Sequence, residues 1–187
     1  WPRLKTLDLD GTPIGPDGYP QLCGAITAKH MPQLQTLHLQ DTGMGDIGAR
    51  LVFSALGCLP TLSLLNLSLN PFGEEGLAPL QHKPMARTHL VVAGLKELHM
   101  LAMPGMNKKA WQFLGRTIMG GTFPALENLY ATAAQPEAVR CAAEPAKLAV
   151  AAIRAGREAT KASKAAVAAL GTVHTAKKKA NKKAKTA

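Results

Sequence analysis

The sequence predicts an α/β solenoid of about four to five strand–turn–helix units, with short parallel strands lining one concave face. Three observations support this prediction. A short frame of residues recurs in register along the first two thirds of the chain. Leucines inside the frame alternate as in a strand, whereas the residues after it have helical periodicity. The apolar volume comes mostly from Leu and Ala, since only 4% of the residues are aromatic although 47% are hydrophobic.

The recurring frame is P-x-L-x-x-L-x-L-x-x-[T/N]-x-[apolar]-G. It occurs over residues 2–15, 32–45 and 60–73. Two weaker copies follow, in which the leading leucines are Leu95 and Leu126. The five leading leucines stand at positions 4, 34, 62, 95 and 126. A recurrence at this spacing is the signature of a stacked repeat.

Each frame predicts a strand and then a tight turn. The alternating leucines point to one side of the strand, and the residues between them point to the other. The Thr or Asn after the strand can bond its side chain to the turning backbone, and the Gly that follows permits a sharp turn. No single unit could bury its leucines alone, so stacking of the units must make the core.

The remainder of each unit predicts a helix. Over residues 46–56 the spacing places Ile47, Leu51 and Ala55 on one face, with Val52 and Leu56 beside them, and Asp46 is the expected N-terminal cap. The third unit carries extra residues around 81–88, where we expect a longer loop or a broken helix. In the fourth unit, Trp111 and Phe113 are expected to pack in the helix.

This frame resembles the leucine-rich-repeat family, in particular the longer repeats of ribonuclease inhibitor and of nucleotide-binding immune receptors. The resemblance covers roughly residues 1–132. It departs from the family pattern at Met103, which stands where the first three frames have Thr or Asn. The resemblance implies a horseshoe whose concave strand face often binds protein partners.

We therefore expect the side chains between and beside the leucines to form a binding wall on the concave face. The wall is polar, with some apolar spots and acidic residues at one end. The candidate partner-binding residues are Asp8, Asp10, His38, Gln40, Asp41, Asn66, Ser68, Glu97, His99 and Tyr130. A solvated sheet face without any ligand remains the alternative.

The residues of the wall predict neither a catalytic site, nor a metal site, nor a cofactor. His38 and His99 invite a metal hypothesis, but Asn66 would stand between them on strands about 5 Å apart. The chain has no CxxC pair, which leaves a zinc site unsupported. The acidic residues of the wall are accompanied by no nucleophile and no phosphate loop.

The composition changes near residue 135, and we expect three regions: a leucine-rich-repeat solenoid at 1–134, an Ala-rich helical extension at 135–171 and a Lys-rich tail at 172–187. Residues 1–132 contain ten Lys and Arg against nine Asp and Glu, whereas residues 133–187 contain twelve against three. Ala, Lys, Arg and Glu predict one helix over about 145–169. This helix could cap the last repeat or stand free in solvent.

The tail is expected to be disordered, because a short run of Ala and Lys cannot bury a core. Its composition is similar to that of linker-histone and ribosomal-protein tails. The candidate phosphate-contacting residues are Lys177, Lys178, Lys179, Lys182, Lys183 and Lys185. Such a segment can attract nucleic acid without reading its sequence, act as a nuclear localisation signal or contact an acidic membrane, or serve only to solubilise the chain.

Two functions remain in view. The first is a non-enzymatic protein–protein interaction or scaffold module that binds a partner through the concave face. The alternative is a structural component of a ribonucleoprotein or chromatin assembly whose tail binds nucleic acid. Three scattered cysteines favour reduced thiols and an intracellular protein, cytoplasmic or nuclear. Because the first residues of the chain already look like the middle of a repeat, we also expect the chain to be a fragment of a larger protein.

Overall fold

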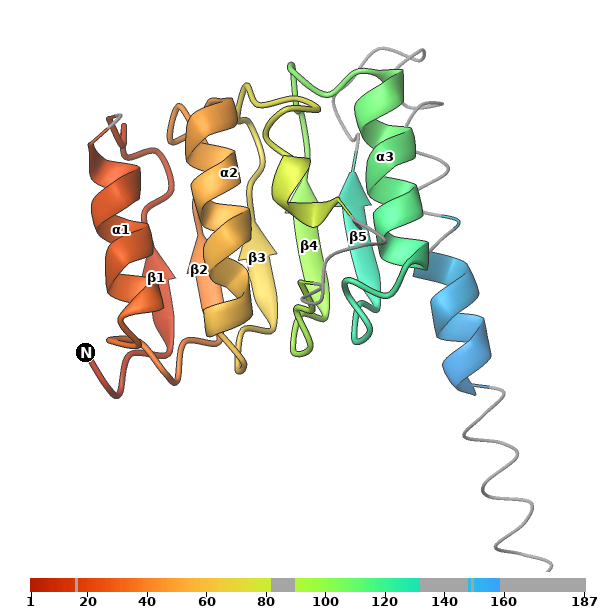
Figure 1. The fold of residues 1–187 in the computed structure, drawn as a ribbon, viewed down its shortest axis with the longest axis horizontal. Coiled ribbons are helices and arrows are strands. Elements are labelled where there is room, and N and C mark those ends of the chain that lie inside the picture. The colour runs from red at the N-terminus through yellow and green to blue at the C-terminus, as the bar shows by residue number, and fades with distance from the viewer. Residues whose placement is uncertain (16, 82–89, 132–147, 149, 159–187) are drawn as a thin grey trace, which may run out of the picture. The chain divides into compact units, whose positions relative to one another are not determined.

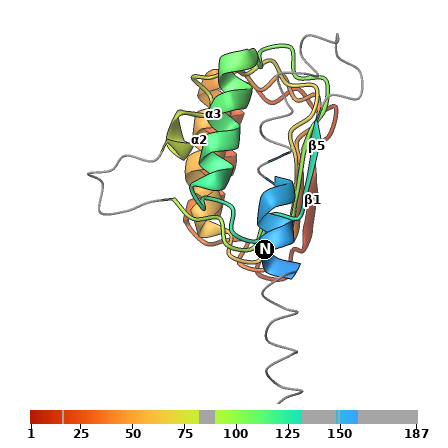
Figure 2. The same cartoon turned by 90° about the vertical axis from the view of Figure 1, so that its right-hand side faces the viewer.

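The computed structural model describes residues 1–15, 17–81, 90–131, 148 and 150–158. Up to residue 131 these residues form two layers, a parallel sheet and a row of helices on one side of it (Figure 2). The chain divides into two compact parts, residues 1–153 and residues 154–187. Residues 1–153 contain the whole sheet, and their architecture confirms the predicted strand–turn–helix repeat.

The sheet has five parallel strands in the order of the sequence (Figure 1). They are Thr6–Asp8 (β1), Thr36–His38 (β2), Leu64–Asn66 (β3), Glu97–Met100 (β4) and Asn128–Ala131 (β5). The register is even, because the central leucine of each strand pairs with the central leucine of the next. The two weaker frames are thereby confirmed as β4 and β5.

The helical layer is less regular than the sheet. It contains α1 (Gly18–Thr27), α2 (Asp46–Ala55) with the 3-10 turn η1 (Leu56–Cys58), and α3 (Lys108–Met119). Among its described residues, the third unit has the short 3-10 turn η2 (Ala78–Leu80) and no α-helix. Residues 82–89, where a longer loop or a broken helix was expected, lie outside the described residues.

The core consists of ladders of equivalent apolar side chains. The leading and alternating leucines of the second, third and fourth frames are fully buried: Leu34, Leu37, Leu39, Leu62, Leu65, Leu67, Leu95 and Leu98. Trp111 is buried as well, and Phe113 packs against the core, as expected. Burying one such side chain stabilises a fold by about 1.5–3 kcal/mol. The stacked ladders therefore supply most of the driving force for this architecture.

A buried polar ladder runs beside the leucines at the turns that follow the strands. The Asn70 amide nitrogen donates to three backbone carbonyl oxygens, those of Leu39 (2.7 Å), Leu67 (3.0 Å) and Ser68 (3.2 Å). Its oxygen accepts from the backbone amides of Thr42 (3.2 Å) and Met44 (2.9 Å). The Thr42 hydroxyl donates to Leu39 O (3.0 Å) and accepts from the Tyr19 hydroxyl (2.8 Å). Side chains of three successive units thus satisfy the turning backbone.

The turns themselves need left-handed backbone. The residue two positions after the last leucine or methionine of the strand has positive φ in four units: Gly11 (68°), Asp41 (51°), Leu69 (61°) and Ala102 (48°). In the fourth unit the turn also requires Gly105, since a Cβ there would lie 2.5 Å from the Phe72 carbonyl oxygen. The turn of one repeat therefore packs directly on the backbone of the one before it.

The predicted cap of α2 is wrong. Gly45 is the N-cap residue, and Asp46 is the first residue of the helix and makes no side-chain cap. Its carboxylate instead accepts from the backbone amides of Gly73 (2.8 Å) and Gly76 (2.9 Å) in the next unit. Because these amides lie within reach and have no helix partner, Asp46 joins two repeats rather than closing one helix.

The predicted apolar face of α2 is confirmed only in part. Ala55 is buried, as are Val52 and Leu56 beside that face, but Ile47 is 76% exposed and Leu51 is only partly buried. The large Phe53 ring needs the space beneath the helix and meets Phe72 edge-on, with ring centroids 5.9 Å apart. Burial of this ring turns Ile47 toward solvent.

Part of the Ala-rich extension is helical, as predicted. Residues 150–158 are in helical conformation. Val150 is buried in the core of residues 1–153, and Ile153 packs against that core, whereas Leu148 is 65% exposed. The rest of the helix predicted over 145–169 and the whole Lys-rich tail lie outside the described residues.

We expect Asn70→Ala to lower the free energy of unfolding by about 3–5 kcal/mol, because it leaves several buried backbone groups without partners. Asn107→Ala is the matched control. Asn107 caps α3 through one bond to the Ala110 amide, 2.9 Å long, and its loss should cost about 1 kcal/mol. Urea denaturation followed by circular dichroism measures both. Equal losses in the two variants would contradict the ladder's role.

Candidate binding surface on the sheet

The strand register aligns one row of side chains across the whole sheet. Because alternate residues of a strand face opposite sides, the neighbours of the buried leucines point away from the helical layer. Asp8, His38, Asn66, His99 and Tyr130 pair consecutively from β1 to β5. We give the name sheet wall to this row together with the other predicted wall residues, which are Asp10, Gln40, Asp41, Ser68 and Glu97. The fold brings its members together from five separate segments of the sequence.

The β1–β2 end of the sheet wall is acidic and ordered by hydrogen bonds. The Asp8 carboxylate accepts a hydrogen bond from the Asp10 backbone amide at 3.0 Å, and the Asp10 carboxylate accepts one from the Gln40 backbone amide at 2.6 Å. The second Asp10 oxygen lies 3.7 Å from His38 Nδ1, which is too long for a hydrogen bond but close enough for an ion pair when His38 is protonated. Both aspartates remain exposed.

The middle of the sheet wall is recessed. Asn66 is 7% exposed and Ser68 is 1% exposed. Asn66 donates to Gln40 Oε1 (3.3 Å) and accepts from the Ser68 amide (3.1 Å), while the Ser68 hydroxyl accepts from the Leu101 amide (3.0 Å). These predicted site residues therefore shape the floor of the wall, and their polar groups are largely used within the fold.

The β4–β5 end is aromatic. The His99 and Tyr130 rings stack at a tilt, with centroids 4.3 Å apart and planes at 41°. His99 Nε2 also lies 3.5 Å from a Glu97 carboxylate oxygen. Tyr130 is 43% exposed, so its ring offers apolar surface that is already held in place.

Of the remaining predicted residues, Asp41 lies in the left-handed turn after β2 and is exposed. The six lysines predicted to contact phosphate lie in the part of the chain that the structure does not describe. No group of three or more His, Cys, Asp or Glu side chains that could hold a metal ion occurs among the described residues. Within the same residues, no helix is long and apolar enough to cross a membrane.

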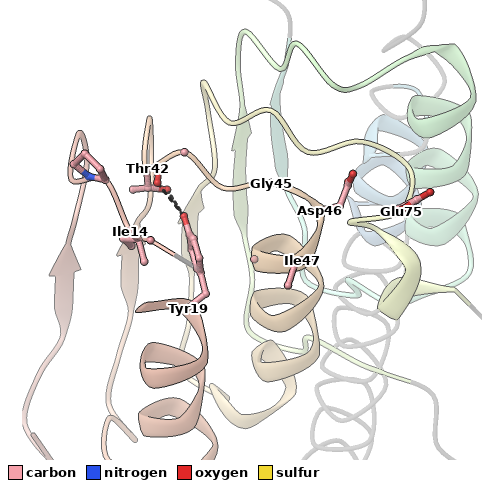
Figure 3. Close-up of a pocket in the computed structure, with 11 residues that line it drawn as sticks. Ile14, Tyr19, Thr42, Gly45, Asp46, Ile47 and Glu75 are labelled. Carbon is pink, nitrogen blue, oxygen red and sulfur yellow. Dashed lines mark hydrogen bonds between the residues drawn. The ribbon is translucent and has the colours of Figure 1, made fainter. Parts of the chain in front are cut away.

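A groove that the sequence did not predict lies between the first two repeats, at the N-terminal ends of α1 and α2. Its volume is about 750 Å3. Figure 3 shows Ile14 and Tyr19 at one end, Asp46 and Glu75 at the other, and Ile47 from α2 between them. Ile47, which the sequence placed on the buried face of α2, is instead exposed and lines this groove.

Two titratable groups in α1 are shifted by burial. Desolvation raises the pKa of the Cys23 thiol to about 11. Desolvation also raises the pKa of Tyr19, although the hydrogen bond with Thr42 acts in the opposite direction. Since the thiolate is the reactive form of cysteine, Cys23 is a packing residue rather than a nucleophile.

Known proteins share both the motif and the fold. The family model described as "Leucine Rich repeat" matches residues 30–52 and 58–80. Among solved structures, the chain is similar to the leiomodin-1 actin-binding site 2, with a TM-score of 0.62, 14% identity and coverage of 89% of this chain and 90% of that one. It is also similar to the Caenorhabditis elegans tropomodulin C-terminal domain, with a TM-score of 0.56, 19% identity and coverage of 84% and 90%. No curated protein matches the chain in sequence.

We expect thiol labelling at pH 8 to separate the two described cysteines. In a Cys141→Ser background, the native protein should react quickly at about one thiol, the partly buried Cys58, because the neutral Cys23 thiol is a poor nucleophile. Adding Cys58→Ser should remove that fast phase, which a chromogenic disulfide reagent measures. A fast phase that persists in the double variant would show Cys23 to be reactive.

Proposed function

We propose that this chain, a leucine-rich-repeat protein, is a non-enzymatic protein–protein interaction or scaffold module that binds its partner through the sheet wall. The observation that carries the proposal is the alignment of the row from Asp8 to Tyr130 across five strands. Side chains on a continuous sheet hold fixed spacings, so a partner meets a preorganised surface. Preorganisation lowers the entropy cost of binding.

The chemistry of the wall supports binding rather than catalysis. The Ser68 hydroxyl, which could have been a nucleophile, is buried and bonded to the Leu101 amide. The ordered polar groups at one end and the exposed Tyr130 ring at the other are typical of a protein interface, where aromatic residues are enriched. An intracellular location is part of the proposal, because both described cysteines are free.

The structural neighbours suggest a first partner to test. The printed title of the leiomodin-1 structure names an actin-binding site on the same fold. At 14% identity this likeness concerns the fold, so actin enters here as a probe. The likeness supports the more general proposal that a leucine-rich-repeat fold of this kind can bind a protein.

Affinity capture with wall and helix-layer variants tests the proposal. His99→Ala with Tyr130→Ala removes the stacked pair from the wall, whereas Arg50→Ala with Lys109→Ala changes exposed residues of α2 and α3. We expect the wall pair to weaken binding of purified actin, or of the partner identified by capture, about tenfold or more, as for an aromatic hot spot. The helix-layer pair should bind like the unchanged chain.

The opposite pattern, with binding lost only in the helix-layer pair, would place the interface on the other side of the molecule. Circular dichroism of both variants checks that the repeats remain folded. Binding that survives both changes would also contradict the proposal.

The basic tail favours a second candidate function, structural binding of nucleic acid. Residues 133–187 hold twelve Lys and Arg against three Glu. Six lysines within 177–185 could neutralise phosphates and release counterions. In this version the solenoid contacts protein while the tail contacts RNA or DNA.

Deletion of residues 172–187 tests the tail. The full chain should bind a duplex of mixed sequence at low salt and lose affinity steeply as salt increases, because the contacts are with phosphate. The deletion should abolish this binding, as measured by fluorescence anisotropy. If the full chain fails to bind at low salt, or the deleted chain binds equally, the nucleic-acid function is wrong.

A further inference from the structure

The sheet wall is chemically polarised along its length. Carboxylates gather at the β1–β2 end, where Asp8, Asp10 and Asp41 are all exposed. The β4–β5 end has one wall carboxylate, that of Glu97, which lies 3.5 Å from His99 Nε2. This end also carries apolar surface, because Tyr130 is 43% exposed and Leu101 is only partly buried. From this asymmetry, and resting on the proposed function, we propose that the wall takes an extended partner segment with a basic residue at one end and an apolar or aromatic residue at the other.

The acidic end lacks compensating cations in the wall. Two residues before the row from Asp8 to Tyr130 lies a second row, formed by Thr6, Thr36, Leu64, Glu97 and Asn128. No Lys or Arg occupies a position of either row, or a described position two residues after the row from Asp8 to Tyr130. Lys5 and Lys96 directly precede the second row, at the opposite end of the strands from Asp10 and Asp41. The Gln40 amide orients the Asp10 carboxylate, and His38 lies next to it. A Lys or Arg side chain would therefore meet two or three carboxylates without a local competitor.

The aromatic end can hold an apolar side chain because its own ring is ordered. Tyr130 lies against His99 at 4.3 Å, which fixes one face of the ring and leaves the other available. Burying such a ring against an apolar group is the usual basis of an interface anchor. An acidic or phosphate-bearing partner has no comparable counterpart at either end.

The spacing sets the length of the segment. Neighbouring strands lie about 4.8 Å apart, so β1 and β5 are separated by about 19 Å. An extended chain rises about 3.3 Å per residue, and about six residues cover that distance. Asn66 and Ser68 are buried and bonded within the fold, so we expect the side-chain contacts of the segment at the two ends of the wall.

Three synthetic peptides of equal length test the inference against the full chain. The first has two arginines at one end and a Trp-Leu pair at the other, separated by four Ser or Gly residues. The second has the same composition with the arginines placed next to the Trp-Leu pair. The third has glutamates in place of the arginines. Fluorescence anisotropy at low salt measures each dissociation constant.

We expect the first peptide to bind at least about fivefold more tightly than the second and the third. Asp8→Asn with Asp10→Asn should weaken it about fivefold or more, since each exposed charge pair contributes modestly and Asn at position 10 can still accept from Gln40. Tyr130→Ala should weaken it about tenfold. Asp17→Asn with Glu75→Gln, which removes the same charge outside the wall, should leave its binding unchanged.

Equal binding of the first two peptides, tighter binding of the acidic peptide, no binding at all, or no effect of the two wall aspartates would overturn the inference. These outcomes are distinct from failure of the proposed function. If the His99→Ala and Tyr130→Ala pair still loses the captured partner while the aspartate pair does not, the wall binds protein but not through a basic segment.

Discussion

The buried bonds of Asn70 and Thr42 are the constraint on which the rest of the structure depends. Where the chain turns inside the core after a strand, backbone amides and carbonyls have no hydrogen-bond partner within the sheet. Each such group costs about 1–3 kcal/mol when buried alone. Asn70 satisfies amides of the preceding unit and carbonyls of two units at once, so the turns become joints between repeats. The leucine ladders supply the driving force, and these bonds join the first three units to one another.

The shared register of the strands is what gives the sheet face its chemistry. Because the five units repeat the same strand in the same register, the side chain that follows each central leucine falls in one row, whatever its type. The row could therefore diverge while the core stayed constant: carboxylates at β1, a recessed Asn66 in the middle, and a stacked His99 and Tyr130 toward β5. Function in such a fold lies in the residues that packing leaves free.

Much of this was predictable from the sequence, for a physical reason. Leucines of period two and turn residues at fixed offsets define the strands and register even in the weak fourth and fifth frames. The helical layer was less predictable, because helix rotation depends on which large ring fills the core. Phe53 occupies the core and leaves Ile47 exposed, and Asp46 bonds the next unit rather than its own helix. These contacts lie between repeats, so no pattern within one repeat contains them, and the groove that Ile47 lines was missed.

A partner that covers the sheet wall must shield the carboxylates that the wall exposes. Carbodiimide labelling of surface carboxylates, quantified by mass spectrometry with and without the bound partner, measures this shielding, because the chain has exposed carboxylates both on the wall and away from it. Labelling of Asp8, Asp10 and Glu97 should fall on binding, while labelling of Glu74 and Glu75 should be unchanged. Protection of Glu74 and Glu75 with the wall carboxylates still reactive would contradict binding through the wall.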